Sequence, residues 1–305
     1  MLITRRQLLK YLLAVAATTS AFPSFSSKSA QHRHVIPSSG EKIPVIGLGS
    51  WLVFGIDPDD ERELIQRIEV IRAFLNSGGG MLDSSPMYGV AQEVIGKSLK
   101  RIGHTDGLFS ATKIWTTGDR AGFLQMSESF DLWGLQKMDL MQVHNLVDWE
   151  RHLPTLQAMK QEGTIRYVGV TTSHGRRHQQ LEHIMKTQSL DFVQFTYNML
   201  DRDAEKILLP MAKDKGIAVI VNRPFQRGGL FEKLQHYHLP DWAGELDCKN
   251  WAQFFLKFVI SHPAVTCAIP ATSQVSHLHE NMAAGYGEMP DESMRKKMIQ
   301  YIKEL

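Results

Sequence analysis

Short apolar runs alternate along this chain with longer stretches whose apolar residues recur every three to four positions, and this alternation restricts the possible folds most. The longer stretches predict helices at residues 60–76, 90–100, 121–133, 153–161, 178–186, 204–214, 249–260 and 275–283. The short runs predict strands at residues 46–49, 81–82, 108–112, 138–143, 167–170, 192–196, 217–221 and 265–269. Eight strands alternating with eight helices over about 250 residues are typical of a (β/α)8 TIM barrel rather than of an open sheet.

Two segments add to this barrel. Residues 35–45 place a Ser-Ser-Gly turn between short apolar runs, which predicts an N-terminal β-hairpin. Residues 225–246 form a connection longer than ordinary loops, and we expect it to lie as a flap over the mouth of the barrel. We therefore expect residues 31–305 to form one barrel domain.

The first 30 residues differ in composition from the rest. Arg5, Arg6 and Lys10 precede an apolar run at 11–17 and then small residues up to Ala21, which is the pattern of a secretory signal. The paired arginines resemble a twin-arginine signal, whose partner is the Tat export machinery. We expect residues 1–30 to be a signal peptide and leader, cleaved after Ala21 or alternatively after Ala30, and the protein to be periplasmic. The apolar run is too short for a stable membrane anchor.

Charge, cysteine content and histidine spacing argue against several classes of protein. The 305 residues carry a formal charge of +2, and Arg5, Arg6 and Lys10 account for +3 of it, so the body of the chain is nearly neutral. A near-neutral body argues against nucleic acid as a partner. The two cysteines, Cys248 and Cys267, are too few for a disulfide scaffold, although one bridge stays open. Histidine pairs occur, but none is joined by the clustered acids or cysteines of a metal site, so no metal is expected.

Polar residues mark the ends of three predicted strands. They are Asp83, Lys113 and His144, with Tyr88 in the loop after Asp83. Taken singly, each has a purely structural explanation, such as a turn cap or a satisfied core histidine. Since strand ends meet at the active face of a barrel, together they can form a proton donor. Tyr88 would give the proton, Lys113 would lower the pKa of the phenol, Asp83 would hold Lys113, and His144 would bind a carbonyl oxygen.

Several spaced motifs then point to one family. They are Gly47-Leu48-Gly49-Ser50-Trp51, the stretch from Leu82 to Gly89, Thr112-Lys113-Ile114-Trp115, Gln142-Val143-His144, the stretch from Gly163 to Val170, and Ile269-Pro270-Ala271-Thr272. In this order they make the chain after residue 33 resemble the aldo/keto reductases. The resemblance implies that Asp83, Tyr88, Lys113 and His144 match the family's catalytic tetrad. It also implies that NADPH lies across the barrel mouth without a Gly-rich Rossmann loop.

The resemblance also assigns cofactor-binding residues. Positions that match the nicotinamide site, the pyrophosphate loop and the adenosine pocket are Thr171, Thr172, Gln194, Asn222, Arg227, Gly228, Thr272, Ser273, His277 and Asn281. Asn222 stands where the family usually stacks a tyrosine on the nicotinamide, and Phe225 or Arg223 could cover the ring instead. Ala271 and His277 replace a common lysine and arginine of the 2′-phosphate pocket. NADPH is the expected cofactor, and NADH is the alternative.

We therefore expect an exported oxidoreductase that reduces an aldehyde or ketone to an alcohol, with Tyr88 as proton donor. Trp51, Trp115 and Trp149 follow strand ends and are expected to line an apolar substrate pocket. A rival hypothesis is a nucleotide-binding sensor or regulatory subunit with little turnover, which Asn222 and Ala271 favour and the complete tetrad disfavours. A metal hydrolase fails because the strand ends lack clustered ligands.

Overall fold

The computed structural model describes residues 30–234 and 236–305, and the expected twin-arginine signal lies almost wholly outside these residues. Eight parallel strands follow one another around a single sheet. They are β3 (Leu48–Gly49), β4 (Gly80–Asp83), β5 (Leu108–Ile114), β6 (Met138–Val143), β7 (Ile165–Thr171), β8 (Phe192–Thr196), β9 (Ala218–Asn222) and β10 (Cys267–Ala268). Parallel bridges from Ile46 to Ala268 and from Gly49 to Ala271 join the two ends of the sheet. The predicted (β/α)8 barrel is confirmed.

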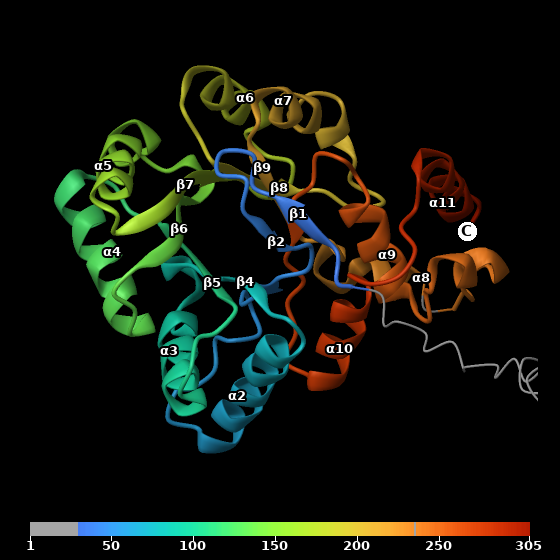
Figure 1. Ribbon diagram of the computed structural model, residues 1–305, viewed down its shortest axis with the longest axis horizontal. Coiled ribbons are helices and arrows are strands. Elements are labelled where there is room, and N and C mark those ends of the chain that lie inside the picture. The colour runs from blue at the N-terminus through green and yellow to red at the C-terminus, as the bar shows by residue number, and fades with distance from the viewer. Residues whose placement is uncertain (1–29, 235) are drawn as a thin grey trace, which may run out of the picture.

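Helices surround the sheet as a ring (Figure 1). Eight lie where the sequence predicts them: α2 (Glu61–Asn76), α3 (Ala91–Ile102), α4 (Asp119–Trp133), α5 (Trp149–Glu162), α6 (His178–Thr187), α7 (Leu208–Lys215), α9 (Trp251–Ile260) and α10 (Val275–Ala283). Two more, α8 (Gly229–Leu234) and α11 (Glu292–Glu304), were not predicted. Helix α8 and short 3-10 turns at 226–228 and 241–246 occupy the segment predicted as a flap. Arg295 ties α11 to the barrel by donating to the Phe258 carbonyl and, at 2.6 Å, to the Tyr197 hydroxyl.

The predicted hairpin closes one end of the barrel. Strands β1 (Arg33–Val35) and β2 (Lys42–Pro44) pair antiparallel and cross the barrel end that faces the viewer in Figure 1. Ile36 and Ile43 of the hairpin join the apolar cluster that fills the barrel interior, which includes Met81, Phe109 and Leu140. The amino ends of the strands are therefore sealed, and the opposite end is left for a site.

Side chains that point into the barrel change from apolar to polar along each strand. Because successive side chains alternate between the two faces of a strand, Asp83 faces inward two residues after Met81, and Lys113 two residues after Ala111. Gln142 follows Leu140 in the same way on β6. A layer of buried polar groups thus covers the apolar plug at the carboxyl ends of the strands.

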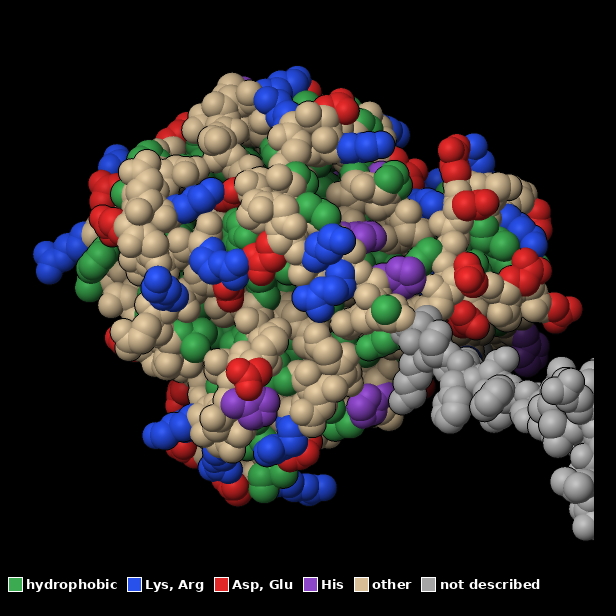
Figure 2. Space-filling model, in the orientation of Figure 1, with side chains coloured by type: hydrophobic (Ala, Val, Ile, Leu, Met, Phe, Trp, Pro, Cys, Tyr) green, Lys and Arg blue, Asp and Glu red, His purple; other side chains and the backbone are tan. Residues whose placement is uncertain are grey.

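Surface charge, helix hydropathy, metal-ligand groups and cysteines are general features of the described residues. On the hairpin face, Lys and Arg side chains are interspersed with Asp and Glu (Figure 2). Within residues 30–234 and 236–305, no helix is long and apolar enough to cross a membrane. The same residues contain no group of three or more His, Cys, Asp or Glu side chains able to hold a metal ion. Cys248 and Cys267 are both buried and free.

Gly96 provides a test of the helix packing. A Cβ added at this residue of α3 would lie 1.7 Å from the Leu132 carbonyl oxygen of α4, which is backbone and has little room to move. Gly96→Ala should therefore lower the free energy of unfolding by about 1–3 kcal/mol, although alanine is the better helix former. Urea denaturation measures this, with Gly244→Ala as the matched control because its Cβ would meet nothing within 4 Å. Equal stability of the two variants would mean that α3 and α4 separate at no cost.

Candidate active site

The segment after β4 sets the position of Tyr88. Asp83 ends the strand, and Ser85 caps the 3-10 turn Pro86–Tyr88 by accepting the Met87 backbone N–H at 3.2 Å. Proline suits this turn because its fixed φ favours the first turn position and its missing N–H needs no partner. Tyr88 is thereby held above the carboxyl ends of the strands, on the side opposite the hairpin.

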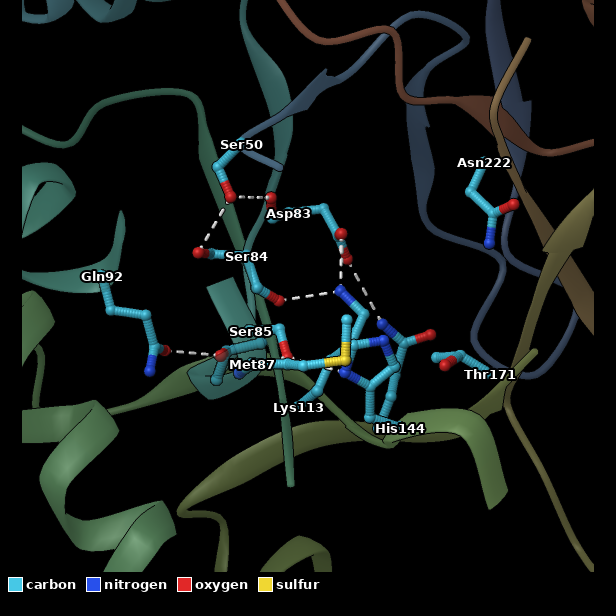
Figure 3. Close-up of polar contacts among 12 residues, drawn as sticks. Ser50, Asp83, Ser84, Ser85, Met87, Gln92, Lys113, His144, Thr171 and Asn222 are labelled. Atoms are coloured by element: carbon cyan, nitrogen blue, oxygen red, sulfur yellow. Dashed lines mark hydrogen bonds and ion pairs between the residues drawn. The ribbon is translucent and has the colours of Figure 1, made fainter. Parts of the chain in front are cut away.

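Lys113 and Asp83 form an ion pair at the centre of the barrel. The Lys113 Nζ lies 2.6 Å from Asp83 Oδ2 and donates a second hydrogen bond, of 2.7 Å, to the Ser84 carbonyl (Figure 3). Gln142 Nε2 donates to the other carboxylate oxygen of Asp83 at 3.4 Å. Both charged side chains are almost completely buried. Burial raises the pKa of Asp83 and lowers the pKa of Lys113, and the attraction between the two opposes both shifts.

Ser85 determines which nitrogen of His144 carries the proton. Its Oγ lies 2.7 Å from His144 Nδ1 (Figure 3) and already accepts the Met87 N–H. Among the described residues the Ser85 hydroxyl has no other acceptor, so its hydrogen is satisfied only by donation to Nδ1. The hydrogen-bond network therefore assigns the ring proton to Nε2. Burial and the nearby Lys113 hold the pKa of His144 well below its ordinary value, so the ring is a neutral donor.

Tyr88 is the fourth residue predicted to act together with Asp83, Lys113 and His144. Its ring meets that of His144 edge to face, with centroids 5.6 Å apart, and the Lys113 Nζ lies 5.3 Å from its centroid. Burial and the Asp83 carboxylate raise the pKa of Tyr88 well above its ordinary value, whereas Arg223 lowers it. The sequence predicted a lowered pKa for this phenol, and the pKa is instead raised because burial and the Asp83 carboxylate outweigh the nearby cations. Tyr88 keeps its proton at neutral pH and can give it away.

These groups line a cavity of about 360 Å³ at the barrel mouth. Asp83, Tyr88, Lys113 and His144 all lie on its wall, as does Trp51. Trp115 and Trp149, expected in the same wall, lie outside it. Backbone hydrogen bonds with Gln125 hold the Trp115 main chain, and its side chain is 43% exposed. Trp149 begins α5 and packs against the core between sheet and helices.

The residues expected to bind a nucleotide fall into two groups. Those on the cavity wall are Thr171, Gln194, Asn222, Arg227 and Gly228. Thr172 Oγ1 and Gln194 Oε1 are buried, and neither has a hydrogen-bond partner within the part of the chain that the structure describes. Buried polar atoms without partners are costly, so this pair marks a place where a polar ligand group fits.

The Asn222 side chain forms hydrogen bonds within the protein, which is a role different from stacking on a nicotinamide ring. Its side chain accepts from the Thr196 hydroxyl at 2.7 Å and donates to the Thr172 carbonyl at 2.9 Å. These bonds join the ends of β7, β8 and β9. The amide plane is therefore fixed by the protein itself.

The remaining expected nucleotide residues lie beyond the cavity, around the start of α10. Thr272 and Ser273 belong to the loop before this helix, and the Thr272 hydroxyl accepts the Gln274 N–H at 3.1 Å. His277 and Asn281 are four residues apart on α10, so they share one face of the helix. His277 is exposed and Asn281 is buried.

Comparisons with known proteins identify the family of this chain. The model of the aldo/keto reductase family matches residues 45–299. Aldo-keto reductase YhdN of Bacillus subtilis is 31% identical over 217 residues, which cover 65% of this chain and 63% of that protein, so the match spans slightly less than two thirds of the relative. The NADH-specific methylglyoxal reductase of Escherichia coli is 25% identical over 246 residues, covering 68% of this chain and 71% of the relative.

A solved structure has the same fold. The aldo-keto reductase from Klebsiella pneumoniae in complex with NADPH superimposes with a TM-score of 0.74 at 21% identity, covering 89% of this chain and 95% of that one. Since the family model matches most of the chain, this protein belongs to the aldo/keto reductase family and is an oxidoreductase.

The sequence did not single out Ser85 as functional. A signal was present, because Ser85 lies between Asp83 and Tyr88 and immediately precedes a proline, as turn caps do. Its contact with His144 spans 59 positions, however, and only the folded barrel brings the two together. Gln142, quoted only as part of a motif, gains its contact with Asp83 in the same way.

Ser85→Ala tests the tautomer. Without the hydroxyl, the neutral His144 ring is free to populate both tautomers, and reduction should slow by roughly 5- to 10-fold, the equivalent of one hydrogen bond. Nitrogen-15 NMR of the histidine rings should show Nε2 protonated in the wild type and a mixture in Ser85→Ala. Ser85→Thr keeps a hydroxyl and should restore the wild-type spectrum. A wild-type ring protonated on Nδ1 would contradict the assignment.

Proposed function

We propose that this chain is an NADPH-dependent reductase that converts the carbonyl group of an aldehyde or ketone to an alcohol, and that it acts after export to the periplasm. The observation that carries the catalytic part is the convergence of two neutral donors, Tyr88 and His144, over the buried Asp83–Lys113 pair in one cavity. Two donors that converge on one point are suited to a carbonyl oxygen that gains negative charge.

The cavity wall fits a nicotinamide nucleotide. Thr172 Oγ1 and Gln194 Oε1 are buried without partners among the described residues, as would suit groups that meet the nicotinamide amide. Arg227 and Gly228, in the turn before α8, would meet the pyrophosphate with a guanidinium and backbone amides. Thr272, Ser273, His277 and Asn281 would hold the adenosine part. A nicotinamide nucleotide held by these residues would supply the hydride for the carbonyl carbon.

The protein's own residues handle the proton. The Tyr88 hydroxyl donates to the substrate oxygen and passes its proton to the developing alkoxide. His144 Nε2–H donates to the same oxygen and orients it. The phenolate that remains is stabilised by the Arg223 guanidinium and by Lys113, whose Nζ lies 5.3 Å from the ring centroid. Asp83 holds Lys113 in place throughout.

We choose NADPH over NADH on the family resemblance and on the solved relative that binds NADPH. Ala271 stands where a lysine is common in the 2′-phosphate pocket, and one relative carries the name of an NADH-specific enzyme, so NADH is the alternative. His277, Thr272 and Ser273 supply polar groups near that position.

Tyr88→Phe tests the proton donor. The ring keeps its packing, so the barrel should fold and NADPH should bind as in the wild type. Loss of the hydroxyl should slow reduction by about 10²- to 10⁴-fold, the usual contribution of a general acid. Single-turnover oxidation of NADPH with aromatic and aliphatic aldehydes measures the rate, and fluorescence titration measures binding.

The same measurements address the sensor hypothesis. Met87→Leu is a suitable control, since Met87 lies on the cavity wall but carries no proton. If the wild type binds NADPH but reduces nothing on the panel, and Tyr88→Phe behaves like the wild type, the chain is a nucleotide-binding module.

The export part of the proposal depends on the first 30 residues. Arg5 and Arg6 ahead of a short, mildly apolar run resemble a signal for the Tat machinery, which carries folded proteins. A chain that folds around its nucleotide before export would explain how a cofactor-dependent enzyme can work outside the cytoplasm.

Replacing both arginines by lysine tests the route. Arg5→Lys with Arg6→Lys keeps the positive charge but removes the paired guanidinium groups, so the protein should remain in the cytoplasm with its N-terminus uncleaved. Fractionation with immunoblotting measures this, and Lys10→Arg is the matched control. Wild-type amounts of the double variant in the periplasm would refute the twin-arginine assignment.

A further inference from the structure

Two arginines that have no acidic partner in the described part of the chain lie at the mouth of the cavity. Arg223 follows the last residue of β9, and Arg227 lies four residues further on. Their guanidinium carbons lie 5.1 Å and 4.5 Å from the centroid of the Trp51 ring, so both pack against one tryptophan. Trp51, Arg223 and Arg227 all line the cavity that holds Tyr88 and His144.

Holding these two guanidinium groups close together costs free energy in the protein by itself. Among residues 30–234 and 236–305, no carboxylate lies in ion-pair distance of either guanidinium, and no acceptor is hydrogen-bonded to them. Burial, together with repulsion from Arg227, lowers the pKa of Arg223 to about 10. Both residues also have a positive φ, 54° and 62°, which costs a residue other than glycine roughly 1–2 kcal/mol. Strained residues that bring two like charges together are a feature of ligand sites.

The rest of the cavity favours an anion. Among the described residues, Asp83 is the one acidic residue on its wall, and Lys113 already neutralises it. The titratable groups that face Arg223 are Tyr88, Arg227 and Arg176, with His174 nearby on the same rim. A negatively charged group would therefore enter the mouth without meeting a free carboxylate.

Two anions could come here, a phosphate of the cofactor or a carboxylate of the substrate, and the position of Arg223 favours the substrate. Arg223 and the Tyr88 phenol interact electrostatically, and Trp51 contacts both: its ring centroid lies 6.4 Å from that of Tyr88. Arg223 thus lies beside the proton donor, where the substrate carbonyl must bind. Resting on the function proposed above, we propose that Arg223 binds a carboxylate on the substrate, so that the preferred substrates are small aldehydes or ketones that carry an anionic carboxylate.

The chemistry of the side chain suits this role. A guanidinium presents parallel N–H donors that match the two oxygens of a carboxylate, and its stacking on Trp51 restricts its orientation. The carboxylate would anchor the substrate at one end while Tyr88 and His144 hold the carbonyl oxygen at the other. Neutral carbonyl compounds would lack this anchor.

The test compares 4-carboxybenzaldehyde with its methyl ester, which differ in charge but share the aldehyde. In the wild type the ratio of kcat/KM, carboxylate over ester, should be about 10 to 100, the value of one charge-assisted hydrogen-bonded pair. Arg223→Met should bring the ratio near one, and Arg223→Lys, which keeps the charge but lacks the fork, should give an intermediate ratio. Arg176→Met, the control, removes a cation outside the cavity wall and should keep the wild-type ratio.

Binding provides a readout independent of turnover. Calorimetric titration with 4-carboxybenzyl alcohol should show binding to the wild type that weakens by about 10- to 100-fold in Arg223→Met. Equal use of both aldehydes by the wild type would overturn the inference while leaving the proposed reductase intact. Equal slowing of both aldehydes in Arg223→Met, together with weaker NADPH binding, would assign Arg223 to a cofactor phosphate and also overturn it. Reduction of neither aldehyde by the wild type would count against the proposed function. In that case the calorimetric titration by itself would show whether Arg223 binds a carboxylate.

Discussion

The buried ion pair between Lys113 and Asp83 is the interaction on which the site depends. Taking both charges out of water is costly, and the short contact, the Ser84 carbonyl and Gln142 offset that cost only in one geometry. Removing either partner would leave an unpaired buried charge, at a cost of about 3–5 kcal/mol. The apolar plug formed by the barrel interior and the hairpin excludes water below the pair. The two charges therefore influence mainly the groups that line the cavity, on the other side of the pair.

Desolvation decides how each group in the cavity is protonated. It keeps the proton on Tyr88 and keeps His144 neutral, so both residues act as hydrogen-bond donors. The Ser85 hydroxyl then selects the nitrogen of His144 that faces the substrate. Arg223, which follows β9, lowers the pKa of the phenol, although burial and the Asp83 carboxylate outweigh this effect. The reacting centre thus combines residues of β4 and β5 with residues of the segments that follow β4, β6 and β9.

The rim of the cavity is electrostatically distinct from its floor. The floor is neutral overall, because its one carboxylate is paired. The rim carries Arg223 and Arg227 against Trp51, with no acidic partner in the described part of the chain. Within the described residues, the buried Thr172 Oγ1 and Gln194 Oε1 have no hydrogen-bond partner. Arg223 therefore takes part in two functions, since it lowers the pKa of Tyr88 and its charge can attract an anionic ligand.

Local pattern in the sequence was sufficient for the architecture and for part of the site. Periodicities of two and of three to four are properties of single elements, so the strands, most helices and the placement of Asp83 and Lys113 at strand ends follow from the sequence itself. Helix α11 was missed although Asp291 caps it and Met298 and Ile302 are buried at a helical spacing, whereas its attachment to the barrel through Arg295 is long-range. Trp115 and Trp149 were expected in the cavity wall because they follow strand ends, but beyond a strand the path of the loop decides where a side chain points. Contacts through space, such as Ser85 with His144 and Arg223 with Trp51, exist only once the barrel closes and brings distant strand ends to one mouth.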